Sequence, residues 1–393
     1  MAARRIGAGE RRARLARRHH LAAGSRATSP VQAASSMGGL HGTDPSSVYL
    51  AAGARMPSAE PAIIERALYD DRELVRLLGM RRTMFVVPLD LAPVVQAACT
   101  RAIAVRERRR TVQLLTRCGV ADDPGAWLAD LEEATVQVLA THGPATAAEL
   151  SVHEPRLRTQ LMLAEGKSYA ASQSVVTRVL MQLAAEGRII RGRPRGSWTS
   201  SQYRWTPIEE WLREGIDHLP TDAARVELVR RWLGTFGPAT VADVKWWTGW
   251  TVGEVKRAVE KLGAVEVDMD GATGLVLPDD LGPEPPVDPW VALLPALDPT
   301  VMGWAGREWY LGEHGRALFD RNGNAGPTIW WDGRIVGGWA HRKDGEVAYR
   351  LLEDLGADAA SAIAAAAEGL RAWIGDVRIT PRFRTPLERE LSA

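Results

Sequence analysis

An eight-residue motif occurs twice in this chain, as GPATAAEL at Gly143–Leu150 and as GPATVADV at Gly237–Val244. Gly and Pro end a helix, and the Thr that follows offers its hydroxyl to cap the next helix, with an acid three residues later. Thr146 and Thr240 therefore predict two helix starts in the same context. Because an apolar helical pattern precedes each copy and a helix and a β-hairpin pattern follow it, the repeat predicts tandem winged-helix units and favours DNA as the partner.

Composition neither requires nor excludes such a partner. The chain of 393 residues is long enough for two or three domains, and its formal net charge is only +1. The charge is unevenly distributed, however. Residues 1–30 contain eight arginines against one acid, residues 188–204 contain five arginines and no acid, and residues 279–288 contain four acids and no base. Local basic patches of this kind attract a polyanion.

Several classes of protein are disfavoured by what the chain lacks. Its two cysteines, Cys99 and Cys118, form no CxxC pattern, and the histidines lack the spacing of metal ligands. This pattern favours a reducing cytoplasm, and we expect no metal and no cofactor. No run of about 18 apolar residues is present, and the Arg-rich start has no apolar segment like that of a secretory signal, so we expect no membrane association.

The pattern of helices, strands and linkers predicts an α+β fold. It contains two clear winged-helix units, a third and less clearly marked unit near the N-terminus, and a C-terminal β-rich domain. The segments that we expect are a basic arm with the first helix (1–24), the first winged-helix-like unit (25–120), the second unit with a basic wing (121–213), the third unit (222–278), a Pro-rich acidic linker (279–289) and the β-rich domain with its terminal helix (290–393).

Local signals place individual elements in these segments. Asp44-Pro45 opens a helix that runs to Ala54, since Asp caps a helix and Pro fits its first turn. We also predict the helices Arg11–Ala23, Asp71–Leu78 and Ser172–Glu186, the strand Arg81–Val87, and an insertion at Pro155–Tyr169.

The most basic wing is the segment RIIRGRPRGSWTSSQYRW at residues 188–205. Two short strands flank an Arg/Gly/Pro loop, and arginines that alternate with Gly and Pro are suited to phosphate, while aromatic side chains offer flat surfaces to a sugar or base. A solvated hairpin without a ligand is the alternative. The residues of this wing that we expect to contact DNA are Arg191, Arg193, Arg195, Trp198, Ser200, Gln202 and Tyr203.

The N-terminal arm and the third unit allow further predictions. The arm is either a solvated tail or a phosphate-binding arm, in which case Arg17, Arg18 and His20 contact DNA. The hairpin of the third unit has an acidic turn at Asp268–Asp270, which would repel phosphate, so we expect this unit to be structural. The tryptophans at 246, 247 and 250 are expected in the core.

Five stretches of the chain carry a resemblance to a known family. They are GGLHGTDP at Gly38–Pro45 with Tyr49, the basic wing, GPATVADVKWWTG, and the later stretches LLPALDPTVMGW and PTIWWDGRIVGGW. These stretches are similar to the winged-helix DNA glycosylases of the AlkZ type, bacterial enzymes that remove alkylated bases and unhook interstrand crosslinks. In that family a Gln-x-Gln or Gln-x-Asp pair stands directly before Asp-Pro and positions the attacking water, whereas this chain has His41 and Thr43 there. The resemblance implies double-stranded DNA, alkylated or crosslinked, as the substrate, and a place at the nucleoid in the bacterial cytoplasm.

The chemistry of these residues can be considered on its own terms. An N7- or N3-alkylated purine is cationic and a good leaving group, so its removal needs an oriented water and stabilisation of an oxocarbenium-like sugar. A neutral imidazole near its ordinary pKa can accept a proton from water, and a hydroxyl two residues on lies on the same face of an extended segment. Asp44 either supplies a negative field or only caps its helix, and His41 could instead be a hydrogen-bonded structural histidine.

Two further points define the expected activity and its alternatives. Lysines are few and none lies near His41 in the sequence, which disfavours a Schiff-base lyase and favours a monofunctional hydrolase. The competing hypotheses are a non-catalytic DNA-binding regulator or scaffold, and a catalytically silent relative that binds damaged DNA. Such regulators usually dimerise, yet no heptad pattern is present, so we expect a monomer.

Overall fold

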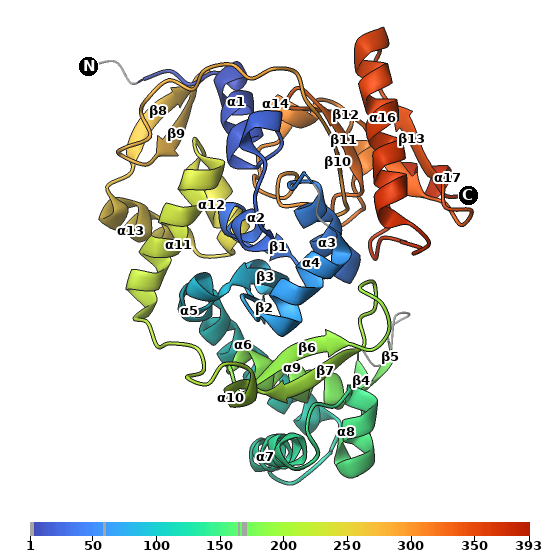
Figure 1. Cartoon of the computed structure of the whole chain (residues 1–393). Coiled ribbons are helices and arrows are strands. Elements are labelled where there is room, and N and C mark those ends of the chain that lie inside the picture. The colour runs from blue at the N-terminus through green and yellow to red at the C-terminus, as the bar shows by residue number, and fades with distance from the viewer. Residues whose placement is uncertain (1–3, 58–59, 164–165, 167–170) are drawn as a thin grey trace.

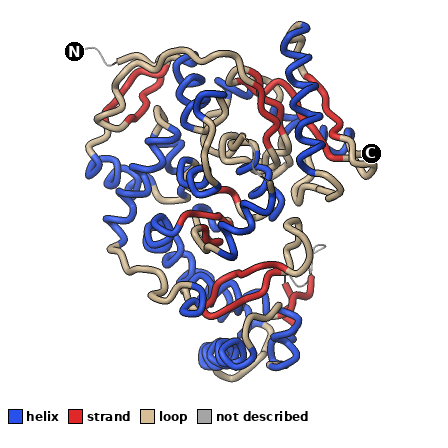
Figure 2. The backbone as a smooth tube through the Cα atoms, in the orientation of Figure 1, coloured by secondary structure: helices blue, strands red, loops and turns tan. Residues whose placement is uncertain are grey.

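The computed structural model describes residues 4–57, 60–163, 166 and 171–393, and it mixes helices with small antiparallel sheets (Figures 1 and 2). In the first 120 residues the three strands form one sheet in the order β1-β3-β2. The elements of this part are α1 (Ala8–Arg18), α2 (Pro30–Ser36), β1 (Leu40–His41), α3 (Pro45–Gly53), α4 (Pro61–Glu65), β2 (Leu74–Leu78), β3 (Met84–Pro88), α5 (Ala92–Val95) and α6 (Arg101–Arg117).

The helix predicted at Asp71–Leu78 is wrong. Arg72 has a φ of +57°, which breaks the helix that runs from α4 through a π-helical turn. Residues Leu74–Leu78 are all buried and form β2, with Val75 opposite Val87 of β3. A fully apolar strand has no alternation that would distinguish it from a buried helix. The helix predicted at Arg11–Ala23 instead runs from Ala8 to Arg18 as α1. It ends before Ala23 because His20 takes a φ of +57°.

The second region begins with the long helix α7 and ends with the basic hairpin. The capping box predicted at Thr146 and Glu149 is confirmed at the start of α8. The helix predicted at Ser172–Glu186 begins only at Val176, because residues 171–174 pair with β4 as a strand. The predicted insertion Pro155–Tyr169 falls partly outside the described residues. The elements are α7 (Pro124–His142), α8 (Ala147–His153), β4 (Gln160–Leu163), β5 (Ala171–Ser174), α9 (Val176–Ala185), β6 (Ile189–Pro194), β7 (Tyr203–Pro207) and α10 (Ile208–Trp211).

The third region repeats the order of helices and hairpin that follows the first motif copy. Thr240 and Asp243 form a second capping box, as predicted. Trp247 and Trp250 lie in the core, as predicted. Trp246 is only half-buried, and the guanidinium groups of Arg81 and Arg307 lie 3.9 and 4.8 Å from its ring. The elements are α11 (Thr221–Phe236), α12 (Val241–Thr248), α13 (Val252–Leu262), β8 (Val265–Met269) and β9 (Ala272–Val276).

The C-terminal region is a four-stranded antiparallel sheet in the order β10-β11-β12-β13, against which the long helix α16 packs at β10 and β13 (Figure 1). Its elements are β10 (Val291–Leu294), α14 (Glu308–Leu311), α15 (Gly315–Leu318), β11 (Thr328–Trp331), β12 (Arg334–His341), β13 (Val347–Leu351), α16 (Ala357–Ile374) and α17 (Pro386–Leu391).

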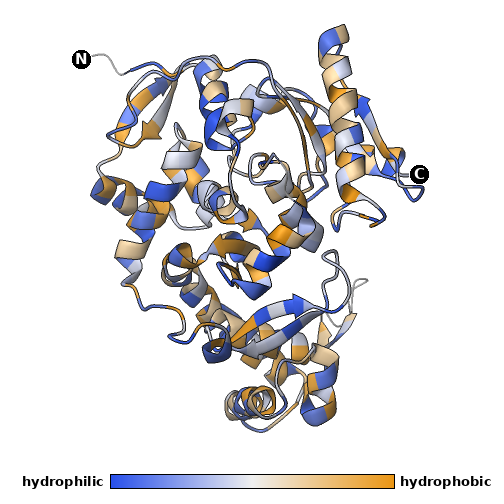
Figure 3. Cartoon of the chain, in the orientation of Figure 1, coloured by the Kyte–Doolittle hydropathy of each residue, from blue (hydrophilic) through white to orange (hydrophobic). Residues whose placement is uncertain are grey.

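Buried apolar side chains form two main cores. The larger core draws residues from Leu15 to Leu391 and so joins the N-terminal, third and C-terminal regions. The smaller core is confined to residues between Leu114 and Trp205. Strands β2 and β3, at the centre of the molecule, are among its most hydrophobic segments (Figure 3). Among the described residues, no helix is both long and apolar enough to cross a membrane, and no group of three or more potential ligands could hold a metal ion.

Candidate active site

The segment Gly38–Asp44 lies against strand β3 and leads directly into helix α3. His41 pairs with Phe85 across the sheet, and the Gly42 amide donates to the carbonyl of Met84 at 2.7 Å. Gly39 has a φ of +108°, and a Cβ at this position would lie 2.8 Å from Val87 Cγ1, so a side chain would clash. The sheet thus fixes the backbone of the candidate catalytic residues.

His41 is a buried and neutral histidine. Its side chain is 5% exposed, its ring centroid lies 5.4 Å from that of Phe85, and Nδ1 has no hydrogen-bond partner among the described residues. Burial, together with the nearby charge of Arg81, lowers the pKa of His41 to about 3. The expectation of an imidazole near its ordinary pKa is therefore wrong, because desolvation of the ring disfavours the charged form.

Thr43 and Asp44 continue the segment with different surroundings. Thr43 Oγ1 is buried and has no partner among the described residues. Asp44 caps α3, since its Oδ1 accepts from the Ser46 amide at 3.1 Å and from the Ser46 hydroxyl at 2.8 Å. Its Oδ2 accepts from the Arg382 amide at 2.9 Å. The carboxylate is thus oriented by three donors and connects the motif to the C-terminal region.

Arg76 of β2 is a residue near this motif that the sequence analysis missed. It is 4% exposed, its guanidinium donates to the carbonyl of Gly42 at 2.9 Å, and it lies 4.9 Å over the ring of Tyr203. Nε and Nη2 of Arg76 have no partner among the described residues. Arg76 is the only polar residue of the apolar stretch LVRLL, which could have indicated a functional role. The incorrect helix prediction for this stretch gave no reason to place Arg76 near the motif.

The three arginines of the basic hairpin have different surroundings. Arg191 is half-buried over the rings of Trp205 and Tyr203, and burial, with repulsion from Arg76, lowers its pKa to about 10. The strand pairing shifts register between Arg191 and Pro194, so the arginines do not share one face.

Arg193 and Arg195 are the more exposed pair. Arg193 forms a salt bridge of 2.8 Å to Asp70, whereas Arg195 is 60% exposed and lies 3.7 Å from Glu149. Of the predicted phosphate ligands in the hairpin, Arg195 has the weakest attachment to the protein itself.

The tip of the hairpin packs into the core. Trp198 is 7% exposed, with ring centroids 5.1 Å from Tyr49 of α3 and 5.8 Å from Trp373 of α16. Its predicted role as an open stacking surface is therefore wrong, because both neighbouring rings cover it.

The other predicted ligands in the tip are Ser200, Gln202 and Tyr203. The Ser200 hydroxyl accepts from the Gln202 amide at 3.2 Å, and the Gln202 side chain is exposed. The Tyr203 hydroxyl is buried without a partner among the described residues. Only Gln202 therefore presents its side chain openly.

The N-terminal candidates are held by the protein itself. Arg17 pairs with Glu284 at 2.6 Å and Arg18 with Asp280 at 2.7 Å, both in the acidic linker. His20 contacts the Ser36 hydroxyl at 2.7 Å through Nε2. Neither a solvated tail nor a free phosphate-binding arm describes these side chains, because the linker supplies the counter-charges.

Known proteins share both the sequence pattern and the fold of this chain. The family model for AlkZ-like DNA glycosylases matches residues 34–373. Among solved structures, the Streptomyces sahachiroi DNA glycosylase AlkZ is similar, with 19% sequence identity, a TM-score of 0.70 and coverage of 95% of this chain and 97% of that one. No curated protein matches the chain. The matched segment includes His41, the basic hairpin and most of the C-terminal region, and the chain belongs to the AlkZ-like DNA glycosylase family.

Proposed function

We propose that this protein is a monomeric, monofunctional DNA glycosylase that hydrolyses the N-glycosidic bond of N7- or N3-alkylated purines in double-stranded DNA, bulky or crosslinked adducts included. One observation carries the proposal. His41 Nδ1 and Thr43 Oγ1, two residues apart, are buried and have no partner among the described residues. Because buried polar atoms are nearly always hydrogen-bonded, this pair is suited to bind and orient a water.

The proposed reaction needs an oriented nucleophile rather than a strong acid. The water oxygen forms a bond to C1′ of the sugar while the bond from C1′ to N9 of the purine breaks. The electron pair of that bond passes to the cationic purine, which leaves as a neutral base, and the water proton passes to solvent. The products are the free alkylated base and an abasic site.

Each residue of the segment has a proposed part in this reaction. His41 remains neutral at physiological pH and is a weak base, so it orients the water instead of accepting its proton. Thr43 supplies the second contact to the water. The Asp44 carboxylate, oriented by Ser46 and Arg382, supplies negative charge beside the oxocarbenium-like sugar.

We also propose that each of three regions is a winged-helix unit: 25–120, 121–213 and 222–278. The order of capped helix, helix and antiparallel hairpin supports this assignment for the second and third regions. The first region departs from this order, since its sheet has three strands and two of its helical turns are π-helical. The arm (1–24) and the linker (279–289) then connect these units to the β-rich domain (290–393).

The test is release of base from duplex DNA that contains N7-methylguanine or a nitrogen-mustard crosslink, with abasic sites detected after alkali. We expect His41→Ala to lower the single-turnover rate by about a hundredfold, since misplacing a reacting group has an effect of this order. Thr43→Val should lower it as well. His314→Ala, which alters a half-buried histidine paired with Glu353, is the control. Tight DNA binding by the wild type without any base release would contradict the proposal and favour a non-catalytic DNA-binding protein.

The pH profile distinguishes an orienting histidine from a general base. Because the pKa of His41 lies near 3, its charge does not change between pH 8 and 5, and we expect a flat single-turnover rate over this range. A general base with the ordinary pKa of about 6.5 would lose roughly thirtyfold by pH 5. His41→Gln, which cannot titrate, is the control, and a midpoint near pH 6.5 that disappears in this variant would contradict the orienting role.

The same shift predicts the direction of the change in stability. Unfolded His41 gains a proton as the pH falls through about 6.5, whereas the folded state resists protonation until about pH 3. The free energy of unfolding should therefore fall below pH 6.5, at up to about 1.4 kcal/mol per pH unit for this histidine. Circular dichroism must accompany the rate measurements, and His41→Gln should show a shallower fall than the wild type.

A further inference from the structure

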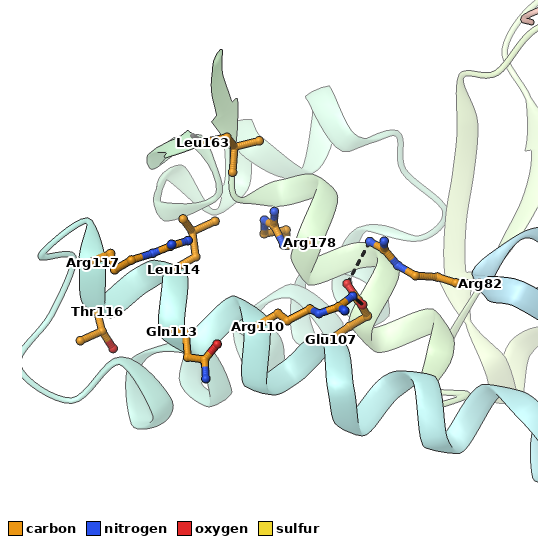
Figure 4. Close-up of a pocket in the computed structure, with 9 residues that line it drawn as sticks. All are labelled: Arg82, Glu107, Arg110, Gln113, Leu114, Thr116, Arg117, Leu163 and Arg178. Carbon is orange, nitrogen blue, oxygen red and sulfur yellow. Dashed lines mark hydrogen bonds and ion pairs between the residues drawn. The ribbon is translucent and has the colours of Figure 1, made fainter. Parts of the chain in front are cut away.

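An open, strongly basic groove lies between helices α6 and α9, outside the motif and the hairpin (Figure 4). Its volume is about 600 Å³. Figure 4 shows that the lining side chains come from α6, from the first turn of α9, from the turn Met80–Arg82 and from β4 (Leu163). The lining residues are Arg82, Glu107, Arg110, Gln113, Leu114, Thr116, Arg117, Leu163 and Arg178.

The charges of this groove are poorly balanced. Glu107 pairs with both Arg82, at 2.9 Å, and Arg110, at 2.7 Å. In the part of the lining that the structure describes, it is the one carboxylate among four guanidinium groups. Arg117 and Arg178 have no ion pair among the described residues, and the Nε of Arg178 is buried without a partner. Burial lowers the pKa of Arg178, and repulsion from Arg82 and Arg117 adds to this effect while attraction by Glu107 opposes it. An anion in the groove would relieve this repulsion.

The groove is also connected to the candidate active site. Arg81 and Arg82 form the tight turn between β2 and β3, with φ values of +53° and +61°. Arg82 lines the groove, whereas Arg81 lies 3.9 Å over Trp246 and acts electrostatically on His41. Strand β3 begins two residues later and pairs with His41, so the turn that carries Arg82 joins the groove to the strand beside the motif.

We propose that this groove binds the phosphodiester backbone of double-stranded DNA beside the lesion, an inference that rests on the proposed function. Arg110, Gln113 and Arg117 lie on one face of α6, at helical positions i, i+3 and i+7. They span about 10 Å at 1.5 Å per residue, which corresponds to roughly three nucleotides of one strand at 3.4 Å each. Among its described residues the lining has no aromatic side chain and only two leucines, whereas protein partners favour an apolar, aromatic core.

The test compares binding of an undamaged duplex over a range of salt concentrations, measured by fluorescence anisotropy. We expect the double variant Arg117→Ala/Arg178→Ala to bind about tenfold more weakly at low salt. Its plot of log affinity against log salt should be less steep by about two units, because the variant neutralises two phosphates fewer. Glu107→Gln should act in the opposite direction and strengthen binding at low salt, because it removes the one carboxylate of the described lining. Arg350→Ala/Arg371→Ala removes two exposed, ion-paired arginines outside the groove and serves as the control for the loss of two positive charges.

The outcomes separate this inference from the proposed function. An unchanged affinity and slope in the double variant, with its fold intact by circular dichroism, would overturn the groove as a DNA site. Binding of a polyglutamate peptide that the double variant loses while it retains duplex binding would overturn it in favour of an acidic protein partner. If the wild type releases no base, the proposed function fails, but the salt dependence still decides whether the groove binds DNA.

Discussion

The two hairpins that follow the two motif copies have the same local construction but different surroundings. In both, a capping box precedes the helices and an antiparallel hairpin ends the unit. The first hairpin, β6–β7, extends toward α3 and α16 and exposes Arg195, whereas the second, β8–β9, binds the N-terminal segment of its own chain. The difference indicates that the motif repeat specifies the local fold of both units. The charge of each hairpin then determines its partner, which for the acidic second hairpin is the basic N-terminal segment.

The second hairpin and the acidic linker together neutralise the N-terminal arm. Asp270 pairs with Arg5 at 2.8 Å, and the backbone of Asp268 accepts from the amide of Ile6 at 2.8 Å. Further along, Asp280 in the linker pairs with Arg14 at 2.7 Å and with Arg18. The arginine-rich start of the chain is thus bound by acidic segments of the same chain, whereas the first hairpin exposes Arg195, and Arg117 and Arg178 of the α6–α9 groove have no ion pair among the described residues.

The largest expected effect concerns Arg14 of α1, which pairs with the acidic linker that follows the second hairpin. Its side chain is 2% exposed and its guanidinium pairs with Glu10 at 3.0 Å and Asp280 at 2.7 Å. Arg14→Ala leaves these carboxylates without their buried partner, so we expect a loss of about 3–5 kcal/mol in the free energy of unfolding, measured by denaturant titration.

Arg4→Ala is the matched control, because Arg4 shares Glu10 but is 24% exposed, and its effect should be below about 1 kcal/mol. DNA affinity should be unchanged in both variants. If Arg14→Ala lowers DNA affinity but changes the free energy of unfolding little, the N-terminal arm contributes to DNA binding and not mainly to stability.

The next effect in size concerns Trp198, at the tip of the first hairpin. Because its ring is buried against Tyr49 and Trp373, we expect Trp198→Ala to cost about 3 kcal/mol in chemical denaturation, close to other large-to-small core changes. Trp198→Phe keeps a ring at the contact and should lose less than half as much. If both variants stay within about 1 kcal/mol of wild type, the tip does not contribute to the core, and the predicted stacking surface would again be open to DNA.

Sequence reasoning identified the elements that have their own local signals. The capping residues Thr146 and Thr240 and the Asp44-Pro45 helix start were predicted because each effect acts within a single turn. Strand β2 was not, since an apolar run gives no helical or strand period.

The candidate site was partly accessible in the same way. His41 and Thr43 were identified from their place in the motif, but the low pKa of His41 and the contact of Arg76 with Gly42 depend on burial and on segments distant in the sequence. The pairing of Arg17 and Arg18 with the linker joins residues more than 260 positions apart, which no local pattern records.

The smallest expected effect distinguishes the charges of the two hairpins directly. Arg195→Ala should weaken duplex binding about threefold at low salt and reduce the salt slope by about one, because the hairpin then neutralises one phosphate fewer. Arg193→Ala should have a smaller effect, since Asp70 already holds that guanidinium. Asp270→Asn, on the second hairpin, should leave both quantities unchanged, because its carboxylate faces Arg5 of the same chain. Fluorescence anisotropy between about 50 and 200 mM salt covers the range in which such contacts are resolved. The opposite result is a salt slope of duplex binding that changes with Asp270→Asn and not with Arg195→Ala. That result would mean that the N-terminal arm binds the phosphates once it is released from the acidic hairpin. The two hairpins would then exchange their roles, although the scaffold that the motif repeat specifies would be the same.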